Sequence, residues 1–356
     1  MVSTVVIANL NSRKNRRDKD KSRIKHLRKI VGSHGIVFPT KSLDDLLEHA
    51  IPFIQKYKPD VVASDSGDGG LVPLITALVE QNGVPIRCDN GCKKGYFPYI
   101  APTAGGTQNV FSKRCGLTTK REVTSYLTEI VQAKSKEELF VENFDLMKIE
   151  DDRGLSMYGF TFGVGMPVTL LEEYYKNKDA RYVRIAWLVT RCITSYLFYK
   201  AKKGFGLQPR KEAHFYAQQI KNFYEIMNVK FPIRVNSEEA QDYLAIMAQT
   251  IPSIGMTWSN MFYRAEKAQR QFHVLGTKAN VDEVLLYLPA IYLGKPTLIV
   301  NDHLDVQTSD MTVSSDVPLH YQVNGELDYL GNKLSANSIR LSYGLTLDII
   351  KTKGTP

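Results

Sequence analysis

The residues best suited to chemistry form the segment Asp65-Ser66-Gly67-Asp68-Gly69-Gly70, which lies between two apolar runs. Glycines let backbone N–H groups approach phosphate oxygens, and a helix that begins here would add the partial positive charge of its N-terminus. A carboxylate beside phosphates is repelled unless it serves a metal ion or accepts a proton. The segment predicts a phosphate site with Asp68 in one of these roles; a tight turn with a helix-capping Asp is the alternative.

A second polar turn covers residues 102–109 and follows another apolar run. It contains Gly105 and Gly106, then Thr107 with a hydroxyl and Asn109 with an amide that can meet a nucleotide. Alone this turn is weak evidence. Two glycine turns at the ends of adjacent parallel strands are stronger evidence, because they can form two walls of one cleft.

A third polar turn covers residues 9–15, after the first apolar run. Asn9 and Ser12 can contact a phosphate or a ribose, and Arg13 or Lys14 can neutralise negative charge. For each of these residues singly, a solvated turn in front of a basic helix explains the pattern equally well.

The elements that must position these turns alternate between strand and helix. Apolar runs at 5–8, 35–38 and 60–63, and one within 84–101, predict strands. Helical spacing at 22–31, after the N-cap candidate Ser42, and at 72–79 predicts the helices between them. Such alternation predicts a parallel α/β sheet, in which ligands bind at the carboxyl ends of the strands.

The pattern changes near residue 140. Short strands separated by turn residues predict an antiparallel β domain. The expected strands are 157–164, 233–235, 243–248, 272–275, 319–323 and 338–341, and the expected helical interruptions are 179–200, 212–227 and 281–292. We therefore expect two domains, 1–138 and 139–356.

The three turns together resemble a known family. Asn9-x-x-Ser12, then Ser66-Gly67-Asp68-Gly69, then Gly106-Thr107-x-Asn109 follow the order of the catalytic motifs of diacylglycerol kinases and sphingosine kinases. The Ser-Gly-Asp-Gly form is most similar to the sphingosine and ceramide kinase branch. Late in the chain, residues 320–326 resemble the Asp-Gly-Glu strand of the family. The resemblance is tight over residues 5–116 and loose after about 155.

This resemblance implies a first domain like that of NAD kinase and phosphofructokinase, followed by a β-sandwich domain. It implies that ATP and Mg²⁺ bind and that the γ-phosphoryl group passes to a hydroxyl of a diacylglycerol-, sphingoid- or ceramide-like lipid, with Asp68 as general base. The nucleotide site implied comprises Asn9, Ser12, Thr40, Ser66, Gly67, Gly69, Gly70, Gly105, Gly106, Thr107 and Asn109.

The chain also departs from the family pattern. Leu10 and Arg13 replace a Pro and a Gly in the first motif, and Gly70 replaces a Thr. In the second domain, Met166 stands where an Asp is common, Asn324 replaces the Asp before Gly-Glu, and an Ala-x-x-x-Asp-Gly motif is missing after Ala265. Asp68 is then the one carboxylate with a matching position.

Charge and hydropathy narrow the partners and the location. The net charge of +9 favours anionic partners, and residues 13–29 hold ten Lys or Arg against two Asp. We find no signal peptide and no run of about 20 apolar residues. We therefore expect a cytoplasmic protein that meets an anionic membrane from outside, rather than a nucleic-acid binder.

Two other functions stay open. One is a kinase for a small soluble alcohol or NAD on the same scaffold. The other is a catalytically weak, membrane-recruited nucleotide-binding regulator, which the missing second-domain carboxylates suggest. The four cysteines do not form a zinc pattern, and we expect reduced thiols.

Overall fold

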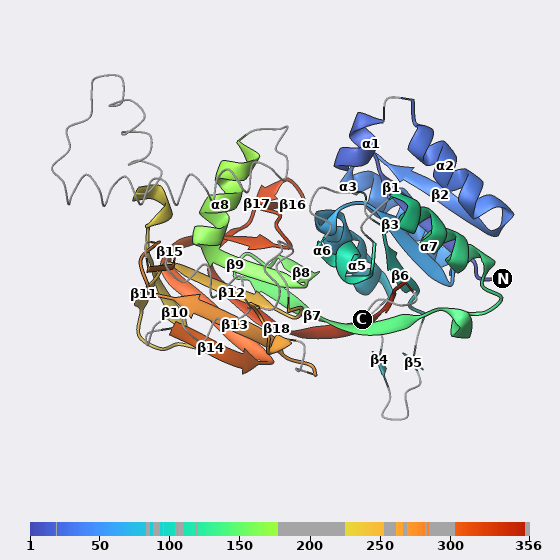
Figure 1. Ribbon diagram of the computed structural model, residues 1–356. Helices are drawn as coiled ribbons and strands as arrows, with labels where there is room; N and C mark the ends of the chain where they lie inside the picture. Colours follow the sequence, from blue (N-terminus) through green and yellow to red (C-terminus); the bar gives the residue numbers. More distant parts are fainter. Residues whose placement is uncertain are drawn as a thin grey trace, which may run out of the picture.

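The structure is a computed structural model that describes most of the chain. The described residues are 1–18, 20–82, 86–87, 93–94, 96–103, 105, 110–117, 120–176, 225–252, 261–265, 269–281, 283–284 and 303–352. Figure 1 shows two parts, one of helices around a sheet and one made mostly of strands.

The first part is built on four parallel strands in the spatial order β6-β3-β1-β2. These strands are β1 (Thr4–Asn9), β2 (Gly35–Thr40), β3 (Val61–Asp65) and β6 (Tyr99–Pro102). The helices are α1 (Arg13–Arg17), α2 (Ser22–Val31), α3 (Leu43–Asp45), α4 (Ile51–Tyr57), α5 (Asp68–Asn82), α6 (Val110–Arg114) and α7 (Lys120–Gln132). Short helical turns span Gly32–His34, Leu46–Ala50 and Lys136–Glu138, and a small hairpin joins β4 (Ile86–Arg87) to β5 (Lys93–Lys94).

Both faces of this parallel sheet are covered, which is why the middle of each strand is mainly apolar. Val5 and Ile7 of β1 pack on one face with α4, α5 and α6, whereas Val6 and Ala8 pack on the other face with α2 and α7. The alternation follows from the two-residue period of a strand. The carboxyl ends of the strands therefore remain the open edge at which side chains can meet a ligand.

The second part is strand-rich. Its strands are β7 (Val141–Asp151), β8 (Ser156–Gly159), β9 (Thr161–Gly165), β10 (Phe231–Val235), β11 (Gln241–Tyr243), β12 (Ala245–Gln249), β13 (Phe272–Thr277), β14 (His303–Thr308), β15 (Asp310–Val323), β16 (Asp328–Tyr329), β17 (Asn332–Lys333) and β18 (Ser335–Ile350), and its described helix is α8 (Met166–Tyr175). Nearly all pairings here are antiparallel, and the apolar side chains of facing strands form one core.

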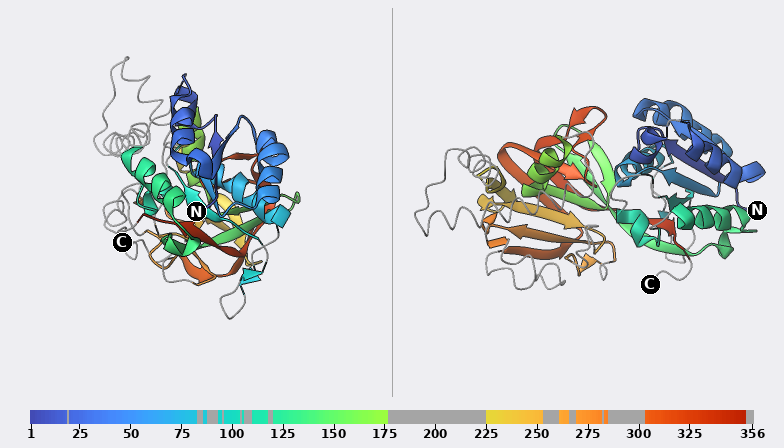
Figure 2. Two further views of the ribbon diagram at one scale, coloured as in Figure 1. Left: turned by 90° about the vertical axis from the view of Figure 1, so that its right-hand side faces the viewer. Right: turned by 45° about the horizontal axis from the view of Figure 1, so that its top comes forward.

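Two long strands connect the parts. β18 pairs with β7 along most of its length, with β15 in the second part, and with β6 through Ile349 and Ile100. Figures 1 and 2 show β7 and β18 running from the helical part into the strand-rich part. The predicted fold class, an α/β part followed by an antiparallel β part, is confirmed.

Several predicted elements differ in extent. α5 begins at Asp68 rather than near residue 72, so Gly69 and Gly70 form the first helical turn instead of a free loop. Glycine is unfavourable inside a helix, but the N–H groups of a first turn have no partner within the helix, so glycines are tolerated there. The expected polar turn after β1 contains the one-turn helix α1, and the sequence pattern missed β7, β14, α8 and most of β18.

Of the helical interruptions expected in the second part, 179–200 lies outside the described residues. Residues 225–227 are helical at the end of the second, and residues 281, 283 and 284 at the start of the third. In the described part of the chain, no helix combines the length and the apolarity needed to cross a membrane.

Phe111 of α6 packs between the parts. Its ring stacks on Phe160 with centroids 4.1 Å apart and meets Phe144 edge-on at 5.0 Å. The side chain is only 1% exposed. This contact holds the segment behind the second glycine turn against the strand-rich part.

We predict that Phe111→Ala lowers the free energy of unfolding by about 3–5 kcal/mol, because it removes a buried ring and leaves a cavity. Phe140→Ala is the control, since that ring is 46% exposed, and it should cost much less. Chemical denaturation measures both. If both variants lost the same free energy of unfolding, the buried Phe111 ring would stabilise the protein no more than the exposed Phe140 ring.

Candidate phosphate site at the strand ends

The carboxyl ends of the four parallel strands meet at one edge, as the sequence predicted. Asn9 pairs with Thr40 across β1 and β2, and Ala8 pairs with Asp65 of β3. Ser64 pairs with Pro102 of β6. The residues that follow each strand are therefore neighbours in space, and the three polar turns lie side by side.

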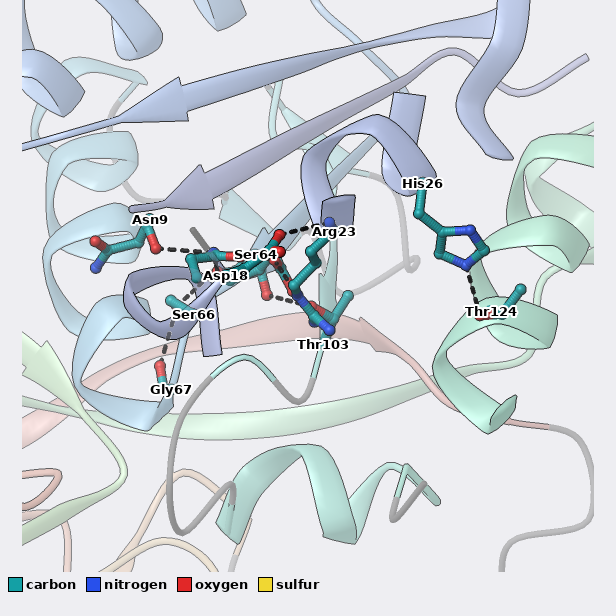
Figure 3. A network of polar contacts seen from close by, with 11 residues as sticks. Asn9, Asp18, Arg23, His26, Ser64, Ser66, Gly67, Thr103 and Thr124 are labelled. Atoms are coloured by element: carbon teal, nitrogen blue, oxygen red, sulfur yellow. Dashed lines mark hydrogen bonds and ion pairs between the residues drawn. The ribbon is translucent and has the colours of Figure 1, made fainter. Parts of the chain in front are cut away.

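The centre of this edge is the carboxylate of Asp65, which is fully buried. Arg23 of α2 donates to both of its oxygens, from Nε at 2.9 Å and from Nη2. Thr103 Oγ1 donates to Oδ1 at 2.7 Å, and Asn15 Nδ2 donates to Oδ2 at 3.2 Å. Figure 3 shows Arg23, Thr103, Ser64 and Ser66 gathered at the end of β3.

Burial raises the pKa of Asp65, but the hydrogen bonds and charge of Arg23 outweigh burial and hold the pKa below its ordinary value. Thr103 and Asn15 act in the same direction. Asp65 is therefore an anion at neutral pH, and its four hydrogen bonds come from three different segments. Its neutralisation by Arg23 leaves it without the free basic oxygen that a proton acceptor needs.

The first polar turn is held in the same network. Asn15 Nδ2 also donates to the carbonyl oxygen of Asn9 at 2.9 Å, and the Asn9 side chain accepts from the backbone of Asn11. Ser12 is 8% exposed and precedes α1, yet among the described residues its hydroxyl has no hydrogen-bond partner, and neither has Oδ1 of Asn15. Buried polar atoms without partners are rare, and a polar ligand is one explanation for them.

The Ser-Gly-Asp-Gly segment turns directly from β3 into α5. Ser66 Oγ bonds Ser64 Oγ at 2.7 Å and the carbonyl oxygen of Gly67 at 3.0 Å, which fixes the turn from inside. A methyl group on Gly70 would lie 2.4 Å from Ser66 Oγ, so the helix start approaches the turn more closely than a side chain allows. Asp68 is the first residue of α5; its side chain lies outside what the structure describes.

The second polar turn is described only in part. Gly105 donates to the carbonyl oxygen of Ser66 at 3.0 Å and accepts from the backbone of Lys14 at 3.3 Å. A methyl group on Gly105 would lie 2.8 Å from backbone atoms of Asp65 and Ser66. The residues Gly106, Thr107 and Asn109 lie outside the described residues. Through its backbone, Gly105 therefore contacts the other two polar turns. This agrees with the expectation that the turns lie together at the strand ends.

A carboxylate from the second part also reaches the start of α5. A methyl group on Gly69 would lie 1.7 Å from Oε1 of Glu326, so this carboxylate lies directly against the backbone next to Asp68. Glu326 is the last residue of the late motif at 320–326, and the sequence pattern assigned it no role. The Gly325-Glu326 pair was the feature that could have pointed to it. Only the fold shows that Glu326 faces the Ser-Gly-Asp-Gly segment.

The departure at Asn324 has a local explanation. Asn324 and Gly325 have φ values of 51° and 83°, a pair of left-handed residues that a tight two-residue turn requires. Asn adopts this conformation more readily than most residues, and Asn324 Oδ1 also accepts from the backbone N–H groups of Phe160 and Thr161 at 2.8 and 2.9 Å. The turn directs the chain so that Glu326 faces Gly69.

A cleft of about 210 Å³ adjoins this carboxylate. Asn9, Gly69 and Gly70 line it on the side of the first part. Its walls come from both parts of the chain and are mainly apolar: Leu43, Val72, Pro73, Met157, Val323, Tyr329, Leu330 and Leu334, with Glu326 and Asp328 at the polar positions. Over the described residues, no three His, Cys, Asp or Glu side chains converge to hold a metal ion.

We predict that Asp65→Asn lowers the free energy of unfolding at neutral pH by about 3–5 kcal/mol, because Arg23 is left buried and unpaired. Since the folded pKa of Asp65 lies below its ordinary value, the stabilisation is present above about pH 4 and is lost as pH falls through the folded pKa. The wild type should thus lose more stability than the variant between pH 5 and pH 2, roughly the acidic range of carboxyl titration.

Asp316→Asn is the matched control, because Asp316 has the same two-point contact with Arg234 but is 79% exposed. Denaturant titrations at several pH values should show little change for it. Identical pH profiles for wild type and Asp65→Asn would contradict the buried-anion description.

Comparison with known proteins places this geometry in a context. No protein-family model matches the sequence, and no curated protein matches it. Solved structures do match. A diacylglycerol kinase from Bacillus anthracis strain Sterne is 12% identical, with a TM-score of 0.56 over 99% of this chain and 98% of that one.

Two further proteins of that strain, both assigned as diacylglycerol kinases, are 14% and 15% identical, with TM-scores of 0.60 and 0.61. Each covers 99% of this chain, and the alignments span 96% and 98% of their own lengths. At such identity the likeness is one of fold. The chain has the fold of these bacterial diacylglycerol kinase-like proteins, and the resemblance that the motifs predicted is confirmed at that level.

Proposed function

We propose that this protein is an ATP-dependent lipid kinase that transfers the γ-phosphoryl group of ATP to a hydroxyl of a lipid. The observation that carries the proposal is the meeting at the start of α5. Glycines 69 and 70, the N-terminus of a 15-residue helix and the carboxylate of Glu326 share one small region. This combination can hold phosphates and also take a proton from an acceptor hydroxyl.

In the proposed complex, the phosphates of ATP lie at the strand ends. The N–H groups of the first turn of α5 face them, because helix N-termini favour anions. The hydroxyl of Ser12, which no described residue pairs, and the side chain of Asn9 supply further hydrogen bonds. Thr40, buried at the end of β2, and Gly105 support the neighbouring turns. The purine base of ATP then lies in the apolar cleft.

Mg²⁺ fits this site in the mode usual for phosphoryl transfer, in which one or two carboxylates and the nucleotide phosphates hold the ion. The carboxylate of Glu326 lies against Gly69. Asp68 directly precedes Gly69 in the chain. When bound, Mg²⁺ neutralises charge on the phosphates. The two residues would hold it, and the chain's glycines leave room for the phosphates.

The proton of the attacking hydroxyl needs an acceptor. Asp65 is unsuited, because Arg23, Thr103 and Asn15 occupy its oxygens. Asp68 stays our proposed general base, and Glu326 is the second carboxylate at the same place. In the proposed reaction the lipid oxygen attacks the γ-phosphorus, ADP leaves, and the hydroxyl proton passes to the carboxylate.

A lipid acceptor is favoured because the solved neighbours of this fold are named diacylglycerol kinases and because the first part carries a basic surface. This basic surface consists of the exposed side chains of Arg16, Arg17, Lys21, Lys25, Arg28 and Lys29. Such a surface attracts anionic lipid headgroups. We propose that the protein docks reversibly on an anionic membrane, where it meets its substrate.

We predict that Asp68→Asn lowers turnover by about two orders of magnitude or more with little change in melting temperature, because the amide cannot accept the proton. Glu326→Gln should also lower turnover. Labelled ATP, Mg²⁺ and a mixed lipid extract, followed by separation of labelled lipids, measure the activity. Near-normal turnover in folded Asp68→Asn would contradict its proposed role, and no labelled lipid from wild type would contradict the lipid kinase.

We predict that the wild type sediments with phosphatidylglycerol liposomes at low salt and is released at high salt, because screening shortens to about 8 Å at physiological ionic strength. Arg16→Glu with Arg17→Glu, or Lys21→Glu with Lys25→Glu, should weaken binding and slow phosphorylation in vesicles more than phosphorylation of a short-chain analogue. Lys56→Glu with Lys134→Glu is the charge-matched control. Liposome binding that ignores both salt and these changes would argue against electrostatic docking.

A further inference from the structure

The hairpin of β16 and β17 ends in a turn with an unusual residue. Leu330 and Gly331 have φ values of 53° and 75°, so both central residues are left-handed. Gly331 suits this conformation. Leu330 does not, because the Cβ of an L-residue clashes with the following carbonyl group there. The preferred residue at the first position of such a turn is Asn or Asp.

The same chain contains a direct comparison. Six residues earlier, the turn before Glu326 has nearly the same pair of φ values, 51° and 83°, and its residues are Asn324 and Gly325. The chain thus uses Asn-Gly in one turn and Leu-Gly in the other. Residues that keep a strained backbone conformation cluster at functional sites, where the role of the side chain compensates for the strain.

Packing in the hydrophobic core does not provide that role. The side chain of Leu330 is 47% exposed. It belongs to neither of the core clusters on which the two parts are built. Its carbonyl group accepts a hydrogen bond from Asn332 Nδ2 at 3.3 Å, a bond that any residue at position 330 would make. The side chain itself is therefore the feature to explain.

Leu330 lies on the wall of the cleft beside Glu326. Opposite walls come from α5, through Val72 and Pro73, and from Leu43 at the start of α3. Figure 1 shows β16 and β17 on the side of the strand-rich part that faces the helical part. The hairpin thus carries an apolar side chain to a cleft that the glycine start of α5 also lines.

The size of the cleft and its mostly apolar lining favour a flat ring that packs by its faces. Its volume of about 210 Å³ is below the roughly 300–1,000 Å³ of pockets that enclose a whole drug-sized ligand. Most of its lining side chains are apolar, and of its polar ones the carboxylate of Glu326 lies against Gly69. A purine base with its phosphates directed to the start of α5 meets both conditions.

We propose that Leu330 is a base-contact residue of the nucleotide site, a clamp that packs on the purine base of ATP and is held at the cleft by its strained turn. The inference rests on the proposed ATP site and adds a contact from the second part of the chain. It explains why the turn has Leu where the chain elsewhere uses Asn. Base binding then joins the two parts through the hairpin, separately from the phosphate contacts.

The test variant is Leu330→Asn, which restores the turn residue that the chain uses at 324. Its melting temperature should rise or stay equal, because strain is removed. Its dissociation constant for ATP, measured by calorimetry, should rise about tenfold through loss of an apolar contact. Its dissociation constant for inorganic tripolyphosphate, which has no base, should not change. Val317→Asn, at an apolar position that is 49% exposed, is the control and should change neither constant.

Each other outcome has a distinct meaning. Unchanged ATP affinity in Leu330→Asn overturns the clamp while the proposed kinase stands. Equal weakening of ATP and tripolyphosphate also overturns it, because the change would then act on the phosphate site. A raised KM for a lipid acceptor with unchanged ATP affinity would assign the cleft to an acyl chain instead. A wild type that binds neither probe would overturn the proposed function and the clamp together.

Discussion

The carboxylate of Asp65 is buried at the end of β3, and it can stay charged there only because Arg23, Thr103 and Asn15 all reach it. A buried charge without such partners would cost several kcal/mol. The requirement acts on three segments at once, since these partners come from α2, the turn after β6 and α1. The arrangement of the strand-end turns, and thus of any phosphate they hold, depends on this one anion.

A second constraint joins the two parts. β7 and β18 are long enough to belong to both, and the antiparallel part can therefore place its turns against the parallel part. The Asn324-Gly325 turn uses this placement to set Glu326 against Gly69. The Leu330-Gly331 turn follows six residues later in the chain and places an apolar side chain on the cleft beside Glu326. In the proposed complex, phosphate contacts thus come mainly from the first part, whereas a carboxylate and a hairpin come from the second.

The structure gives local reasons for two departures from the family pattern, Asn324 and Gly70. The missing Asp before Gly-Glu is explained by the turn, which favours Asn and uses its side chain to hold Phe160 and Thr161. The carboxylate that follows is retained and reaches the site. The Gly at position 70, where a Thr is usual, lies so close to Ser66 that a side chain would have to displace it. Neither change removes the features on which the proposed chemistry depends.

The sequence by itself determined the parallel α/β part and the adjacency of its polar turns, and it singled out Asn9, Ser66 and Gly69 as candidates, because strand and helix periods and glycine patterns are local signals. It did not reveal that Gly69 and Gly70 lie inside the first turn of α5. It also missed the long strand β18 and the Asp65 network, because these depend on partners far away in the chain. Arg23 and Asp65 are 42 residues apart, and nothing local marks them as a pair. Only the tertiary structure decided that Arg23 neutralises the carboxylate of Asp65 and that the carboxylate of Glu326 lies against Gly69.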